Sequence, residues 1–248
     1  MKTRTIIPVF LAAGMFFSCR AQSVVRIDCS QAPVNKTYEL TGFEALHVSS
    51  GFEVELIPSD RESVQLMIPS DVENHVMVKK DGKTLRIGLK EGSSVAFFSN
   101  RDDDCLKAYV HFKDLHGIKG SGATEIDIKG VYDAKNRNLD ITLSGASSFE
   151  GSVLNLDKLT ATLSGASELE MKGMADQLDL GLSGASEADL EDFSAKNFTG
   201  SLSGASKAEL TVTETFSGSA SGASKIKVKG RPRVLKANDS GASTIRFE

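Results

Sequence analysis

Hydroxyl and carboxylate side chains recur at fixed distances from a tetrapeptide that returns through the second half of this sequence. The tetrapeptide reads Ser-Gly-Ala-Ser or Ser-Gly-Ala-Thr, and its seven copies begin at Ser121, Ser144, Ser164, Ser183, Ser203, Ser221 and Ser240. Mostly Thr, Ser or Asp stand two and four residues before the first Ser, and the candidate ligand face consists of Asp140, Thr142, Thr160, Thr162, Asp179, Thr199, Ser201, Ser217 and Ser219. A regular array of hydroxyl groups suits an extended polymer such as a glycan, because many weak hydrogen bonds add up along its length. Thr and Ser are also ordinary exposed strand residues, and this second interpretation stays open.

A second set of regularly spaced side chains carries charge. Four and six residues after the first Ser stand mainly acidic and then basic side chains: Glu125, Glu168, Glu187, Lys207 and Lys225 in one series, and Asp127, Glu150, Glu170, Asp189, Glu209, Lys227 and Arg246 in the other. Like charges stacked in a row repel one another, and a bound cation could offset that repulsion. The favoured interpretation is a solvated face without a metal site.

Catalytic motifs are missing from the sequence. The four histidines, His47, His75, His111 and His116, have no metal-binding spacing, and no G-x-S-x-G elbow occurs. An enzyme that degrades polysaccharides is the catalytic alternative, with the acidic series as its metal site and Lys207 or Arg233 as base or charge stabiliser. We predict a protein that is not an enzyme and needs no cofactor.

The spacing of the tetrapeptides predicts the elements that carry these side chains. Successive copies lie 23, 20, 19, 20, 18 and 19 residues apart, a period typical of solenoids. Apolar residues alternate with polar ones before the tetrapeptide, as in Leu139, Ile141 and Leu143, and after it, as in Ile126 and Ile128. Each repeat therefore has two strand segments joined at the tetrapeptide, where Gly permits a positive φ and Ala leaves room at the bend over the core.

These patterns predict an all-β protein with a short-coil, single-stranded, parallel and right-handed β-helix, on which a β-rich N-terminal half is stacked. A run of antiparallel hairpins is the alternative, because alternation does not reveal strand direction. The predicted divisions are a signal peptide over residues 1–18, an N-terminal β-rich part over 23–114 and the repeats over 115–248. In the N-terminal part, Asp81-Gly82 predicts a hairpin turn.

The first residues predict export. A positively charged start precedes the apolar run from Ile6 to Phe17, and Ser18-Cys19 then resembles the cleavage and lipidation box of bacterial lipoproteins. Lipidation at Cys19 would give an outer-membrane-associated lipoprotein that faces the periplasm or the cell surface. Cleavage after Ala21 is the alternative, and it would give a soluble periplasmic or secreted protein.

Charge limits the partners. Without Lys2 and Arg4 the chain keeps 27 basic and 33 acidic residues, a net charge of −6, which argues against nucleic acid as a partner. The expected partners are a polysaccharide or an envelope protein, the membrane through the lipid anchor, and a second copy of the chain in a homo-oligomer.

Two further features of the N-terminal half remain open. Cys29 and Cys105 could form a disulfide in an oxidising compartment, or stay as two thiols. The segment 93–100 is expected to be a loop, and its Phe97 and Phe98 either bind a ligand or plug the N-terminal end of the β-helix.

The run Gly-Phe-Glu-Ala-Leu-His-Val-Ser-Ser-Gly-Phe-Glu-Val-Glu-Leu at residues 42–56, together with the tetrapeptide series, resembles the putative auto-transporter adhesin, head GIN domain family of Bacteroidota-type bacteria. The resemblance extends from about residue 39 to 245. It implies a secreted or lipid-anchored all-β protein with β-helical stacking and no established enzymatic activity. Because the sequence stops at Glu248 without a membrane barrel or sorting domain, we do not expect it to translocate itself.

The sequence as a whole predicts a non-enzymatic cell-envelope protein that adheres to an extended glycan or envelope polymer through its repetitive polar surface. The alternative is a structural spacer or assembly protein without a tight ligand.

Overall fold

The computed structural model describes residues 23–27, 31–90, 93–97 and 105–248. The predicted signal peptide, Cys19, Cys29 and Phe98 lie outside these ranges. The described residues form strands and no helix, so they contain no helix that could cross a bilayer. The prediction of an all-β protein is confirmed.

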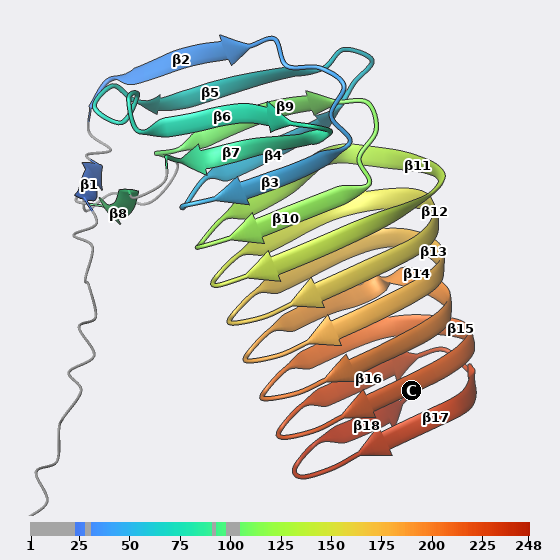
Figure 1. Cartoon of the computed structure of the whole chain (residues 1–248). Coiled ribbons are helices and arrows are strands. Elements are labelled where there is room, and N and C mark those ends of the chain that lie inside the picture. The colour runs from blue at the N-terminus through green and yellow to red at the C-terminus, as the bar shows by residue number, and fades with distance from the viewer. Residues whose placement is uncertain (1–22, 28–30, 91–92, 98–104) are drawn as a thin grey trace, which may run out of the picture.

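The described ranges contain eighteen strands (Figure 1). Those before the long repeats are β1 (Ser23–Ile27), β2 (Pro33–Tyr38), β3 (Ala45–Ser49), β4 (Glu53–Pro58), β5 (Ser63–Pro69), β6 (Val76–Asp81), β7 (Thr84–Leu89), β8 (Ser93–Phe97), β9 (Lys107–Phe112) and β10 (Gly117–Ser121). The remaining strands are β11 (Glu125–Ser144), β12 (Ser148–Leu163), β13 (Glu168–Leu182), β14 (Glu187–Leu202), β15 (Lys207–Ala220), β16 (Lys225–Lys229), β17 (Arg233–Asp239) and β18 (Thr244–Phe247).

Each repeat is one coil of a solenoid, and the coils are stacked along one axis (Figure 1). A strand leaves one tetrapeptide corner, bends, and returns to the next corner, and adjacent strands pair in parallel from β10 to β18. The predicted β-helix is therefore confirmed, and the alternative of antiparallel hairpins is wrong for the repeats. From β11 to β15 the two predicted segments continue through the bend as one strand, 14 residues long in β15 and 20 in β11. In the last coil they are the separate strands β16 and β17. Register shifts at the bend absorb the unequal repeat lengths.

The bend divides every coil into an incoming side, which leads into the next corner, and an outgoing side, which leaves the previous one. Both sides continue into the N-terminal half. The incoming side extends through β10, β3 and β7 to the antiparallel β6, and the outgoing side through β4 and β9 to the antiparallel β5 and β2. The predicted hairpin turn at Asp81-Gly82 joins β6 to β7 and is confirmed.

Strands β3 and β4 form a further coil of the same stack, with residues 49–52 as its corner. The amide of Ser50 donates to the carbonyl of Ser121 at 3.3 Å, and the amide of Gly51 donates to the carbonyl of Gly122 at 3.0 Å. This corner reads Ser-Ser-Gly-Phe, so the search for the tetrapeptide does not detect it.

The inward residues of the predicted alternation form one continuous core. In two late coils the inward pattern of Leu is replaced by Phe and Gly. The rings of Phe198 and Phe216 stack with their centroids 5.0 Å apart. A Cβ atom on Gly218 would lie 2.4 Å from the ring of Phe216, so this ring occupies the space that the missing side chain leaves.

Glycine is required at the corners for two separate reasons. The corner glycines from Gly145 to Gly241 have φ between 73° and 81°, a conformation that side chains oppose. From the corner at Ser164 onward, the amide of each corner Ala donates to the Gly carbonyl of the preceding coil at 2.7 to 2.8 Å. A Cβ atom on Gly184 would lie 2.5 Å from the carbonyl oxygen of Gly165, so a side chain there would force the coils apart.

The fourth residue of the tetrapeptide, rather than its Ala, faces the core. The corner Ala is exposed, whereas the fourth residue, Ser or Thr, is only 0 to 6 % exposed in all seven corners. The inward alternation of the outgoing strand extends back into the corner and reaches this residue. From Ser147 to Ser243 its hydroxyl donates to the carbonyl of the first Ser of the same corner at 2.7 to 2.9 Å. The hydroxyl of Thr124 has no hydrogen-bond partner among the described residues.

Two features of the N-terminal half differ from expectation or extend beyond the described ranges. Residues 93–97 form β8, which pairs in parallel with β1, so the expected loop is wrong for these five residues. The partner strand is distant in sequence, and local patterns do not reveal such a pairing. Cys105 is disulfide-bonded. Both other cysteines lie outside the described ranges, so Cys29 as the partner of Cys105 stays a prediction.

The corner glycines yield a stability prediction. We expect Gly184→Ala to cost about 1–2 kcal/mol through the positive φ alone and more in total, because its Cβ would also meet the backbone of the preceding coil. Gly82→Ala is the matched control: φ is 58° there and nothing lies within 4 Å of the added Cβ, so only the conformational cost remains. Urea unfolding of both variants measures the difference, and equal losses would contradict the proposed coil contact.

The buried corner hydroxyls yield a second prediction. Ser186→Ala removes a hydrogen bond of 2.9 Å to the carbonyl of Ser183, and we expect a loss of about 1–2 kcal/mol. Thr124→Val should be neutral or stabilising, because it replaces a buried hydroxyl without a partner by a methyl group of similar size. The midpoints of urea unfolding measure both variants, provided that the dependence of the unfolding free energy on urea concentration is unchanged. A loss of stability in Thr124→Val as large as that in Ser186→Ala would contradict the finding that only the Ser186 hydroxyl is hydrogen-bonded.

Candidate functional site

The nine residues of the candidate ligand face lie together on the outer surface of the incoming side. Parallel pairing places Thr142, Thr162, Ser201 and Ser219 in one row, with Gly181 in the middle. The adjacent row contains Asp140, Thr160, Asp179, Thr199 and Ser217. All nine are exposed or half-buried. We call this surface the hydroxyl face, and its rungs are about 4.8 Å apart, as in any sheet.

Few internal contacts occupy the hydroxyl face. Within the described ranges, the side chains of Thr142, Thr162 and Ser201 make no hydrogen bond to the protein, and Asp179 forms an ion pair with Lys158. These small side chains are therefore available to an external partner.

The first row of the hydroxyl face continues into the N-terminal strands with four basic residues, which sequence analysis missed. Thr142 pairs with Lys119, Lys119 with His47, His47 with Arg86, and Arg86 with Lys79. The signal that could have found them is the corner at residues 49–52, because His47 stands two residues before Ser49, as Thr142 does before Ser144. We call Lys79, Arg86, His47 and Lys119 the basic end of the hydroxyl face.

A shallow hollow lies at this basic end. It is lined by His47, Arg86 and Lys119 in one row, and by Asp140 and Thr142 where the hydroxyl rows begin. Ala45 and Gly117 also line it, and their small size in the second row leaves the space open. An Nη1 atom of Arg86 lies 3.1 Å from Nδ1 of His47, and since arginine can only donate, His47 accepts with this nitrogen. Burial, and then the positive charges of Lys119 and Arg86, lower the pKa of His47, so its ring is neutral at pH 7.

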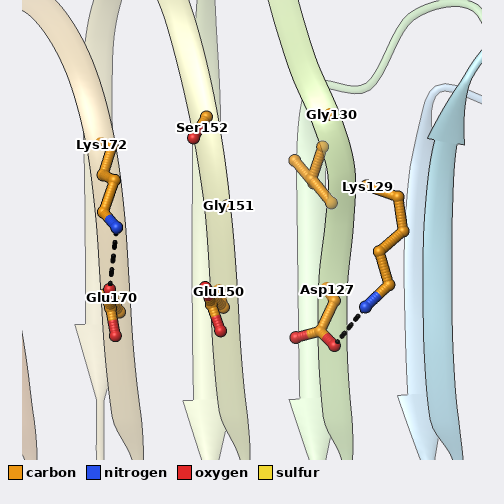
Figure 2. Close-up of a pocket in the computed structure, with 9 residues that line it drawn as sticks. Asp127, Lys129, Gly130, Glu150, Gly151, Ser152, Glu170 and Lys172 are labelled. Carbon is orange, nitrogen blue, oxygen red and sulfur yellow. Dashed lines mark hydrogen bonds and ion pairs between the residues drawn. The ribbon is translucent and has the colours of Figure 1, made fainter.

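The charged residues predicted after the tetrapeptide lie on the outer surface of the outgoing side, which we call the charged face. Figure 2 shows Asp127, Glu150 and Glu170 side by side on three neighbouring strands. Lys129 reaches Asp127 at 3.1 Å, and Lys172 reaches Glu170 at 3.6 Å. Glu150 has Ser152 in the place of such a lysine and makes no ion pair to a described residue.

Toward the C-terminal end the charges of this face neutralise one another. Lys207 lies 2.6 Å from Glu187 and 2.9 Å from Glu209. Hydrogen bonding with Lys229, and then with Glu209 and Lys227, lowers the pKa of Glu191 to about 2. Across the described ranges, no group of three or more His, Cys, Asp or Glu side chains is arranged to hold a metal ion. The charged face is thus largely compensated from within.

The residues named for the catalytic alternative do not converge. Lys207 lies on the outgoing side, and its hydrogen bonds with Glu187 and Glu209 raise its pKa, which keeps the amine protonated and unsuited to act as a base. Arg233 lies in β17 on the incoming side. Phe97 ends β8, and whether Phe97 and Phe98 bind a ligand stays a prediction.

Comparison with solved structures identifies the fold. The chain is similar to a putative adhesin from Bacteroides fragilis, with a TM-score of 0.78 and 19% identity, covering 90% of this chain and 100% of that one. It is also similar to a putative lipid binding protein from Parabacteroides distasonis, with a TM-score of 0.73, 18% identity and coverage of 90% and 100%. A putative adhesin from Parabacteroides merdae has a TM-score of 0.66 and 14% identity, with 90% and 99% covered. At these identities the likeness concerns the fold alone, and no curated protein matches the chain.

A family model provides the remaining comparison. It matches residues 42–232, which include the corner at residues 49–52 and six of the seven tetrapeptides. The chain therefore belongs to the family described as putative auto-transporter adhesin, head GIN domain.

Proposed function

We propose that the hydroxyl face binds an extended polysaccharide of the cell envelope or of a neighbouring surface, and that the protein acts in adhesion. The observation that carries this proposal is the continuous register of two adjacent rows of small polar side chains over successive coils. A linear sugar chain carries hydroxyl groups at regular intervals along its length, and the rungs of the face follow one another at about 4.8 Å. One chain laid along the solenoid axis could therefore make similar contacts on each coil.

The contrast between the two faces supports this choice of surface. Lysines neutralise many carboxylates of the charged face, and a ligand there would have to compete with existing ion pairs. On the hydroxyl face, Thr142, Thr162 and Ser201 have no competing partner among the described residues. Binding there would exchange water for sugar hydroxyls without breaking internal contacts.

The proposed location is the outer membrane, with a lipid anchor on Cys19. The apolar run of residues 6–17 followed by Ser18-Cys19 supports this address. An anchored solenoid would present its long polar faces to the surroundings of the membrane.

The binding proposal predicts the effect of filling the hydroxyl face. A triple variant with Thr142→Lys, Thr162→Lys and Ser201→Lys should lose binding in a glycan array and to purified cell-wall sacculi, because three long side chains would cover one row. A second triple variant, Ser148→Lys, Ser152→Lys and Thr244→Lys, adds the same charge to the charged face and is the control. We expect the control to bind like the unmodified protein.

Two outcomes would contradict this proposal. Equal loss in both triple variants would indicate a charge effect rather than a blocked surface. The absence of any binding by the well-folded unmodified protein would favour the structural spacer or assembly protein instead.

The anchor proposal predicts that a labelled fatty acid is incorporated in the producing cells. Cys19→Ala should abolish this label, because the thiol is the group that becomes acylated. Cys29→Ala is the control and should keep the label. A protein that is never labelled, or is labelled equally after Cys19→Ala, would favour cleavage after Ala21.

A further inference from the structure

We propose that the basic end of the hydroxyl face binds an acidic group of the polysaccharide, so that the ligand is an anionic glycan with carboxylate or sulfate groups. This inference rests on the proposed function and adds the class of glycan and the end of the face that recognises its charge. The row that carries hydroxyl groups on the long coils carries Lys79, Arg86, His47 and Lys119 on its first four rungs.

The cations of the basic end are less compensated than those of the charged face. Lys79 and Lys119 are both exposed, and neither forms an ion pair with any residue that the structure describes. By contrast, Lys129, Lys207, Lys227 and Lys229 on the charged face all pair with carboxylates. A negatively charged ligand can therefore approach the basic end without displacing an internal partner of either lysine.

Arg86 has donor capacity that the protein does not use. Its Nε atom is buried beside Asp81 Oδ2, 3.4 Å away, and is out of a ligand's reach. The side chain as a whole is 37 % exposed, so the donors open to a ligand are those of the Nη atoms. Its Nη1 atom contacts Nδ1 of His47, which orients the guanidinium beside the hollow. A guanidinium held in this way can donate further hydrogen bonds to a carboxylate or sulfate, the acceptors that its planar shape fits best.

The hollow places these cations next to hydroxyl-binding groups. His47, Arg86 and Lys119 line one part of it, and Asp140 and Thr142 line the part that adjoins the hydroxyl rows. Asp140 can accept hydrogen bonds from sugar hydroxyls, while Ala45 and Gly117 leave room for a sugar ring. An acidic sugar in the hollow would thus have its charge at the basic row and its neighbours along the hydroxyl face.

Two carboxylates oppose an anion here, namely Asp81 beside Arg86 and Asp140 in the hollow. The three permanent cations, Lys79, Arg86 and Lys119, outnumber them. The pKa of His47 should change when an anion binds. A bound anion favours the protonated ring and should therefore raise this pKa from its lowered value. An uncharged sugar would not have this effect.

The test compares matched glycans. Isothermal titration calorimetry first compares the affinity for oligogalacturonate with that for the same chain after reduction of its carboxyl groups. It then compares a sulfated with a desulfated chondroitin, which separates the effect of sulfate from that of carboxylate. We expect oligogalacturonate to bind about tenfold more tightly than its reduced, neutral chain. Desulfated chondroitin keeps its carboxylates, so the second comparison measures the contribution of sulfate alone. Lys79→Ala combined with Lys119→Ala should remove most of this preference, so that oligogalacturonate and its reduced chain bind with similar affinity.

The control for charge is Lys225→Ala combined with Arg246→Ala, two exposed cations on the outer surface of β16 and β18. This double variant should keep the preference. Loss in both double variants would indicate general electrostatic attraction and overturn the site. Equal binding of acidic and neutral chains would overturn the acidic-ligand inference but leave the proposed function standing, whereas no binding of either chain would remove both.

An NMR titration of the His47 ring provides a readout independent of affinity. We expect oligogalacturonate to raise the pKa of His47 in the unmodified protein, while the reduced chain leaves it unchanged. Inorganic sulfate alone serves to detect an adventitious ion. The inference fails if sulfate raises this pKa as much as oligogalacturonate does at equal charge concentration, or if oligogalacturonate leaves the pKa unchanged.

Discussion

From the corner at Ser164 onward, the hydrogen bond from the corner Ala amide to the Gly carbonyl of the preceding coil, 2.7 to 2.8 Å long, sets the register on which the rest of the structure depends. Only glycine permits both the positive φ and the close approach of the coils at this point. A slip by one residue would turn the whole inward series outward, so a fixed corner fixes both faces of every strand. The buried fourth residue adds a second constraint, because its hydroxyl closes the corner onto the carbonyl of the first Ser.

Register at the corners explains why side chains of one kind form long rows on the surface. On the outgoing side the rows carry charges of both signs, and their long side chains reach one another across the coils. On the incoming side the rows carry Thr and Ser, which are too short to reach the next rung in most positions. The same backbone therefore yields one face that is compensated from within and another that is open to partners.

How much of this could be read from the sequence depended on whether the repeat was intact. The seven tetrapeptides predicted the solenoid, its parallel pairing and the nine residues of the hydroxyl face, because spacing and alternation are local signals. The corner at residues 49–52 lacks the tetrapeptide, so the basic end remained undetected, although His47 lies in the run of residues 42–56 that resembles the family. The pairing of β1 with β8 joins distant segments, and no local pattern encodes it. Residue type alone did not identify the buried residue of the corner, because Ser is usually exposed, whereas the periodicity of the outgoing strand places Ser186 in the core.

The weakness of each contact determines how such a face could bind at all. A neutral hydrogen bond to an exposed hydroxyl exchanges one partner for water and contributes only about 0.5–1.5 kcal/mol. A single coil is therefore insufficient, and useful affinity requires several rungs engaged by one chain. Rows of equal residues also allow a ligand to slide by one coil at little cost, because every position resembles the next. The basic end breaks this equivalence, since a charge-assisted contact at Arg86 and Lys119 favours one position and one direction of the bound chain over its shifted copies.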